Sequence, residues 1–206
     1  EQTERHGVYI VGYTDGTFGP SRSMTRAEAA AIFARLLAEK NGDTISTAAN
    51  TKFADIPAHA WYSGYVKYLS NNGITYGKSK TIFAPNDAIT RAEFTTMAVR
   101  FFDVYGDGDA EIMEQFSGFN DVSSGYWAAK YIKYAALHGW INGYGDGSFH
   151  AEREINRAEV VTIVNRLLGR EADEDYIADN LRKLNTFPDV SRKHWAYYAV
   201  MEAANA

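Results

Sequence analysis

One arginine recurs three times inside the same short motif, at a position that suits the binding of an anion. It is the second residue of Thr-Arg-Ala-Glu at 25–28 and 90–93, and of Asn-Arg-Ala-Glu at 156–159. Thr or Asn three residues before Glu is typical of a helix N-terminal capping box, so the arginine is expected at the first helical position. We expect its guanidinium to face outwards beside free backbone N–H groups, where its planar fork can bind a carboxylate. The three predicted ligand contacts are Arg26, Arg91 and Arg157.

Aromatic and acidic residues recur with the arginines and are further candidates for contacts with a ligand. Each of three Phe-x-Asp triplets is followed by a Trp six residues after the Asp. A Trp ring can stack on the apolar face of a ligand, and a carboxylate can accept hydrogen bonds from hydroxyl groups. These candidates are Trp61, Trp127, Trp195, Asp55, Asp121 and Asp189. Two Gly-Tyr pairs of a glycine-rich motif add Gly12, Tyr13, Gly143 and Tyr144.

Each candidate also has a structural interpretation, which the sequence leaves open. The Thr and Glu of the capping boxes are expected to be structural only. The three Trp begin helices and can pack in a core, whereas the three Asp can cap those helices or pair with Arg. The glycines of the Gly-rich motif are expected at turns with positive φ: Gly12, Gly16, Gly143 and Gly147.

Two sequence blocks recur with a period of about 66 residues, which predicts a repeat protein. The front block has the Phe-x-Asp…Trp pattern, and the back block has Gly-x-x-Asp-Gly-x-Phe followed by Thr-Arg-Ala-Glu. Together they form complete units at 53–102 and 119–168, while a lone back block spans 7–38 and a lone front block spans 187–206. A solitary block would leave an apolar face uncovered. We therefore predict that the two lone blocks pack together, which closes three repeats into one pseudo-threefold domain with adjacent termini.

The blocks predict a mainly α fold with a helix, a loop and a second helix in each repeat. After each capping box, apolar residues follow at i, i+3, i+4, i+7 and i+8, as in an amphipathic helix. The front helix begins near each Trp and is expected to stop at Gly73 and Gly139. A hairpin-like loop, such as residues 12–20, joins the two helices. The linker 169–186 has the apolar spacing of an extra short helix.

These blocks resemble the S-layer homology (SLH) family over roughly 7–38, 53–102, 119–168 and 187–206. The most specific matches are Thr-Arg-Ala-Glu, the Gly-Tyr-x-Asp-Gly-x-Phe loops and the Phe-x-Asp…Trp starts. The resemblance implies three repeats in one pseudotrimer on the bacterial cell surface. It also implies non-covalent anchoring of a surface protein through a secondary cell-wall polysaccharide, often one that carries a pyruvate ketal. Other S-layer proteins are further candidate partners.

The repeats differ at positions that the resemblance makes important. The middle loop contains Lys78 and Lys80 and lacks the Tyr and the Asp-Gly pair, while the third unit has Ala151 for Pro and Asn156 for Thr. We therefore expect one or two strong grooves, with the two lysines adding positive charge to the middle one.

Composition excludes several other classes of protein. The net charge of −5 disfavours nucleic-acid binding, and the absence of Cys excludes disulfides, thiolate metal sites and a Cys nucleophile. No apolar run is long enough to insert into a membrane. Because the first residues lack a signal peptide, an export signal is expected to have been upstream and removed.

Three other functions are alternatives to anchoring. A wall glycosidase would need two carboxylates in a cleft, but the recurring acidic residues fit caps and loops, and no cofactor or catalytic motif is expected. A calcium site is suggested by Asp103-Val104-Tyr105-Gly106-Asp107-Gly108 with Glu114, although Tyr105 stands where a ligand belongs. A solvated acidic turn fits better, so no metal site is predicted. A lattice-forming module without carbohydrate binding is the third alternative.

Overall fold

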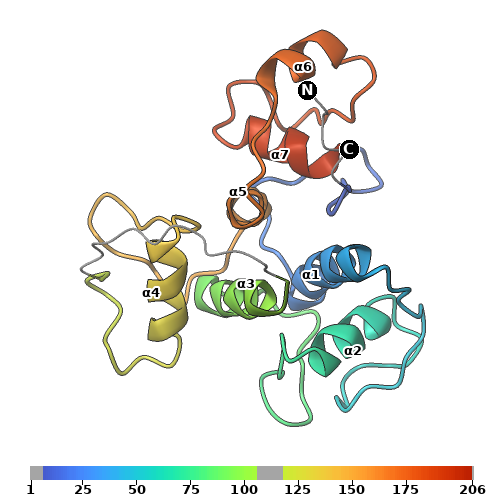
Figure 1. Ribbon diagram of the computed structural model, residues 1–206, viewed down its shortest axis with the longest axis vertical. Coiled ribbons are helices and arrows are strands. Elements are labelled where there is room, and N and C mark those ends of the chain that lie inside the picture. The colour runs from blue at the N-terminus through green and yellow to red at the C-terminus, as the bar shows by residue number, and fades with distance from the viewer. Residues whose placement is uncertain (1–6, 106–117, 206) are drawn as a thin grey trace. The chain divides into compact units, whose positions relative to one another are not determined.

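The computed structural model describes residues 7–105 and 118–205, and this part of the chain is mainly helical and lacks a β-sheet. This confirms the predicted fold class. The helices, shown in Figure 1, are α1 (Arg26–Asn41), α2 (Ser63–Asn71), α3 (Arg91–Tyr105), α4 (Ala129–Leu137), α5 (Arg157–Leu167), α6 (Glu174–Asn180) and α7 (Tyr197–Ala204).

The three long helices α1, α3 and α5 begin at the predicted capping boxes. The Glu28 N–H donates to Thr25 Oγ1 at 3.2 Å, and the Thr25 N–H donates to Glu28 Oε2 at 2.8 Å. The same reciprocal pair forms at 90–93 and at 156–159. Each box satisfies two backbone groups that would otherwise have no partner, and so fixes where its helix starts.

The shorter helices also agree with the sequence: α2 and α4 end just before the expected glycines, and the expected extra helix is present. Gly73 and Gly139 follow α2 and α4 with φ of 73° and 69°. The left-handed turn lets the Ile74 N–H donate to Leu69 O at 3.0 Å, which closes the end of α2. The expected extra helix is α6, whose N-cap is Asp173.

The chain divides into two compact units. One is Met24–Ile155, in which α1 packs on α2, α3 packs on α4, and the two long helices pack on each other (Figure 1). The centre of this unit is aromatic, since the Phe33 ring lies 5.4 Å from that of Phe94 and 4.9 Å from that of Phe101. These buried rings pack α1 against α3.

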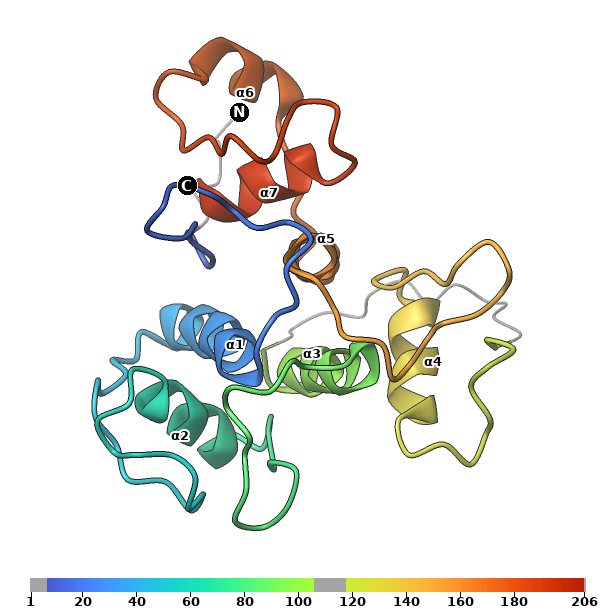
Figure 2. The same ribbon diagram turned by 180° about the vertical axis from the view of Figure 1, so that it is seen from behind.

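The second unit combines the first described residues with those after Ile155. Here α5 packs on α7, and the first described segment runs beside α7 (Figure 2). The Tyr9 N–H donates to Ala203 O at 3.4 Å, and the Phe18 and Phe187 rings lie 5.3 Å apart. Helix α1 itself packs on α2 in the other unit. The closure of three repeats into a pseudo-threefold domain stays a prediction.

A membrane-spanning helix is not found in the described residues, because none of their helices combines sufficient length with sufficient hydrophobicity.

Candidate functional site

The three recurring arginines are buried, which corrects the outward orientation expected from the sequence. Their exposed fractions are 4–5%. In each, Nε donates to the carbonyl oxygen of a loop Phe at 2.7–2.9 Å, and Cζ lies 4.5–4.9 Å from the centre of the same ring. The guanidinium therefore gains a hydrogen bond and a cation–π contact inside the protein. The three pairs are Arg26–Phe83, Arg91–Phe149 and Arg157–Phe18.

The backbone N–H groups at the helix starts are also occupied, contrary to expectation. The Arg26 N–H donates to Asp87 O at 2.9 Å, and the Ala27 N–H donates to Pro85 O at 3.0 Å. Equivalent bonds begin α3 and α5. Loop carbonyls thus take the donors that an anion would need at these helix starts.

The tyrosines of the Gly-Tyr pairs lie against buried guanidinium groups. Arg157 Cζ lies 4.6 Å from the centre of the Tyr13 ring, and Arg91 Cζ lies 5.2 Å from that of Tyr144. Tyr144 remains 39% exposed, so part of its ring faces solvent. Lys78 holds the equivalent position in the middle loop.

The three recurring aspartates fasten the front block to the loop. The Asp55 carboxylate accepts the N–H groups of Phe83 at 2.9 Å and Ala84 at 2.6 Å. The other two clamps join Asp121 to Phe149 and His150, and Asp189 to Phe18 and Gly19. The three aspartates therefore hold the loops in place. The two structural roles expected from the sequence are wrong, because other residues cap these helices and the carboxylates bond to loop N–H groups and not to the recurring arginines.

Two of the four loop glycines have a different role from the one predicted. Gly16 and Gly147 have φ of 83° and 79°, as expected for turns, but Gly12 and Gly143 do not have positive φ. These two are required by close packing instead. A Cβ on Gly12 would lie 2.5 Å from Cε1 of Phe187, and one on Gly143 would be closer still to Phe119.

The three recurring tryptophans lie on the surface. Trp61, Trp127 and Trp195 are 54%, 53% and 65% exposed, whereas Trp140 is buried. The core-packing interpretation therefore fails for all three, and their rings are accessible to a ligand.

Trp127 lines a groove of about 380 Å³ in the Met24–Ile155 unit. The groove is formed by the loop between α2 and α3, the start of α3, the segment before α4 and the loop before α5. Its lining residues are Gly77, Lys78, Thr90, Glu93, Trp127 and Glu152. The structure thus brings the predicted Trp127 together with Lys78, but the recurring arginines do not line the groove.

Each charged side chain of the groove has an ion-pair or hydrogen-bond partner, and these partners differ in how buried they are. Lys78 Nζ lies 3.3 Å from Asp87 Oδ2, and the Lys78 side chain is 42% exposed. Glu93 Oε1 lies 3.0 Å from Nη1 of the buried Arg26. Glu152 accepts a hydrogen bond from the Tyr126 hydroxyl. The pKa of Tyr126 is raised mainly by desolvation and, to a smaller extent, by this hydrogen bond. Lys78 is therefore the groove cation that can most readily exchange its partner, because exposed ion pairs are weak.

Sequence reasoning missed Glu152, which also borders a second pocket of about 500 Å³. That pocket is lined by Asp121, Tyr126, His150, Ala151, Glu152 and Arg153. Glu152 could not be found from the repeat, because Asn86 and Ser21 stand at the matching positions.

The described residues contain no cluster of His, Asp and Glu that could hold a metal ion. The part of the calcium-like segment that follows Tyr105 lies outside the described residues.

Comparison with known proteins identifies the repeats. The chain matches the S-layer homology domain over residues 4–30, 52–95 and 118–161. Over 97% of its length it is 35% identical to Cell surface glycoprotein 1 and 32% identical to the Cellulosome-anchoring protein, both of Acetivibrio thermocellus. Over 77% of its length it is 32% identical to the Surface-layer 125 kDa protein of Lysinibacillus sphaericus. The chain spans only 8%, 42% and 13% of these three proteins.

Proposed function

Because the chain belongs to the S-layer homology family, we propose that it anchors a surface protein to the bacterial cell wall by binding an anionic, pyruvylated polysaccharide. Relatives named for the cell surface, the surface layer and cellulosome anchoring support the anchoring role and an extracellular location. The observation that carries the choice of ligand is the exposed Trp127 ring beside Lys78 in one groove.

The groove offers the contacts that a sugar requires. The face of the Trp127 indole stacks on the apolar side of a pyranose ring. Thr90, Glu93 and Glu152 supply a hydroxyl group and two carboxylates for the sugar hydroxyls. These residues contact the neutral groups of the sugar, and Lys78 contacts its negatively charged group.

Lys78 provides the contact with the pyruvate carboxylate. Its ammonium exchanges the exposed Asp87 carboxylate for that of the ligand, at little cost in free energy. The buried arginines act through other residues: Arg26 holds Glu93 at the groove wall, and Arg91 supports the loop of Phe149. In this proposal they are positioning residues.

We propose that the chain itself is not catalytic. A glycosidase needs one carboxyl group that donates a proton and one that acts as base or nucleophile. The groove carboxylates already have roles, since Glu93 pairs with Arg26 and caps α3, and Glu152 accepts the Tyr126 hydroxyl. A structural module without carbohydrate binding is the second candidate, and the burial of the three arginines favours it.

Calorimetric titration with pyruvylated wall polysaccharide, and with the same polymer after removal of pyruvate, tests the proposal. We expect binding that depends on pyruvate. Trp127→Ala should weaken it about tenfold, since an aromatic contact contributes about 0.5–1.5 kcal/mol beyond the area it buries. Tyr176→Ala on α6 is the control, because Tyr176 is similarly exposed at 48% and lies outside the groove.

Failure of the folded protein to bind either polymer would favour the structural module. Equal binding of both polymers would retain a carbohydrate ligand and remove the role of Lys78. Release of reducing sugar during the titration would contradict the non-catalytic assignment.

A further inference from the structure

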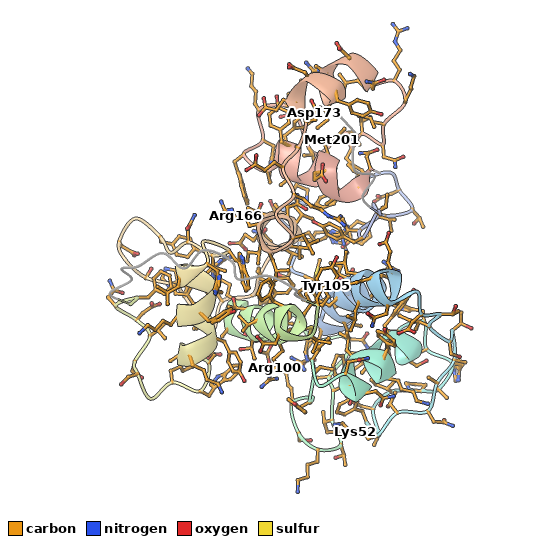
Figure 3. All side chains as sticks on the ribbon, viewed as in Figure 1. Lys52, Arg100, Tyr105, Arg166, Asp173 and Met201 are labelled. Carbon is orange, nitrogen blue, oxygen red and sulfur yellow. The ribbon has the colours of Figure 1, made fainter. Side chains whose placement is uncertain are left out.

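A chain of alternating cations and aromatic rings crosses the surface of the Met24–Ile155 unit. Lys52 Nζ lies 5.8 Å and Arg100 Cζ lies 4.8 Å from the centre of the Tyr76 ring. Arg100 Cζ also lies 5.0 Å from the Tyr131 ring, and Lys130 Nζ lies 4.8 Å from it. We call these five residues the cation–aromatic ladder. Figure 3 labels Lys52, in the segment before α2, and Arg100, on α3.

The ladder exposes positive charge on the surface. Within residues 7–105 and 118–205, none of its three cations forms an ion pair with a carboxylate, whereas Lys78 and Arg26 do. Lys52 and Lys130 are exposed, and Tyr76 is 55% exposed. Although desolvation raises the pKa of Tyr131, the hydrogen bond from Arg100 and the charges of Arg100 and Lys130 lower it overall. The two cations therefore favour the ionised form of the Tyr131 hydroxyl group.

Residues of the ladder are close in sequence to residues that line the groove. Tyr76 directly precedes Gly77, which lines the groove. Tyr131, on α4, follows Trp127 by four residues. Lys52 directly precedes Phe53, whose ring limits the space at Gly77. A chain of sugars that leaves Trp127 can therefore continue onto these residues.

Helix packing alone does not explain the ladder. In the first repeat, Arg35 and Tyr65 form an equivalent pair between α1 and α2, with Cζ 5.0 Å from the ring. In the third repeat, α5 has Arg166, but Ala199 on α7 replaces the tyrosine. Helices α5 and α7 still pack together, so the Arg–Tyr pair is not needed to join two helices.

We propose that the ladder is a second subsite for the same wall polysaccharide, which takes a charged sugar further along the strand. This inference rests on the proposed function of the groove. Lys52, Arg100 and Lys130 would meet carboxylates of successive repeat units, while the hydroxyl groups of Tyr76 and Tyr131 contact the intervening sugars. Two connected subsites make the second contact intramolecular, which raises the affinity for a long strand above that for a short one.

The test compares two pyruvylated probes, a single repeat-unit oligosaccharide and the long polymer, on a variant with Lys52→Gln and Lys130→Gln. Both lysines are exposed, so the variant should fold. We expect the affinity for the polymer to fall about five- to tenfold, since each exposed ion pair contributes a fraction of a kcal/mol to about 1 kcal/mol. Affinity for the oligosaccharide should stay unchanged, and the loss of polymer affinity with added salt should become less steep.

A control variant with Lys67→Gln and Lys183→Gln makes the same change in net charge at two exposed lysines outside the ladder. It should bind both probes like the unmodified chain. Arg100→Gln is a second ladder variant, and it should weaken polymer binding in the same direction.

If the ladder variants bind the polymer like the unmodified chain, the second subsite is wrong while the groove proposal stands. An equal loss in the control variant would also overturn it, because the effect would then be one of net charge. If the unmodified chain binds neither probe, both proposals fail.

Discussion

Arg26 Nη1 lies 3.0 Å from Glu93 Oε1, so the arginine at the start of α1 pairs with the glutamate at the start of α3. Glu93 also closes the capping box of α3 and lines the groove. This pair therefore connects two repeats and sets the position of one groove wall. Through this pair, a buried arginine that does not line the groove positions a residue that does.

Replacing Arg26 should lower stability more than affinity. Arg26→Met should reduce the free energy of unfolding by about 3–5 kcal/mol, because Glu93 would be left as an uncompensated, partly buried charge. Denaturant unfolding measures the loss, and Glu93→Gln in the same background should recover part of it. If Arg26→Met abolished binding and left stability unchanged, Arg26 would be a direct ligand contact.

Gly143 and Gly145 provide a matched pair for testing how the loop packs. Gly143→Ala should destabilise the protein by about 1–3 kcal/mol, since the new methyl group would overlap the Phe119 ring. Gly145→Ala should change stability by about 0.5 kcal/mol or less, because nothing lies within 4 Å of its Cβ position. Thermal or denaturant unfolding compares the two. Equal effects would contradict the packing role of Gly143.

The Asp121 clamp predicts a specific dependence of stability on pH. Desolvation raises the pKa of Asp121, but the N–H groups of Phe149 and His150 outweigh it and hold this pKa below the ordinary 3.8. A carboxyl group whose folded pKa is depressed stabilises the fold above its unfolded pKa, and this contribution is lost as the pH falls through the folded value.

Unfolding of the unmodified chain and of Asp121→Asn should therefore be compared from about pH 6 to about pH 2. The unmodified chain should be more stable at the upper end, and its advantage should shrink below pH 3.8. A difference that stays constant with pH would show that the carboxylate charge does not contribute to the clamp.

Ala84 adopts a left-handed conformation that costs free energy. Its φ is 59°, and Gly19 holds the matching position in the first loop with φ of 69°. Ala84→Gly should raise the free energy of unfolding by up to about 1 kcal/mol, although greater freedom of the unfolded chain offsets part of the gain. A decrease would mean that the alanine methyl group makes packing contacts worth more than the strain.

Asp87 competes with the ligand for Lys78 in the proposed site. Asp87→Asn removes this competitor and should strengthen binding of the pyruvylated polysaccharide by about two- to fivefold, the range expected from a weak surface ion pair. Lys78→Gln should weaken it. Calorimetry measures both, and no change in either variant would exclude Lys78 as the contact for the carboxylate.

Much of the fold follows from short-range sequence patterns. Thr25-x-x-Glu28 predicts the start of α1 because its hydrogen bonds are local, and Gly73 predicts the end of α2 for the same reason. The period of the repeats indicates how many such units to expect. The closure of the repeats depends on contacts between distant segments, and no local pattern settles it.

The sites of individual side chains were harder to predict. The motif places Arg26 at a helix start, but its burial depends on Phe83, which is 57 residues away. The exposure of Trp127 likewise depends on what packs around the start of α4. Lys78 was indicated by its departure from the repeat, whereas Glu152 enters the groove through the meeting of two loops.

The most direct test of the proposed site follows the indole N–H signals of the four tryptophans by ¹H–¹⁵N NMR during titration with a pyruvylated repeat-unit oligosaccharide. The proposal predicts that the signal of Trp127 shifts, that the signal of the buried Trp140 does not, and that removal of pyruvate weakens the effect. A Trp127 signal that stays unchanged at saturating oligosaccharide would contradict binding in this groove.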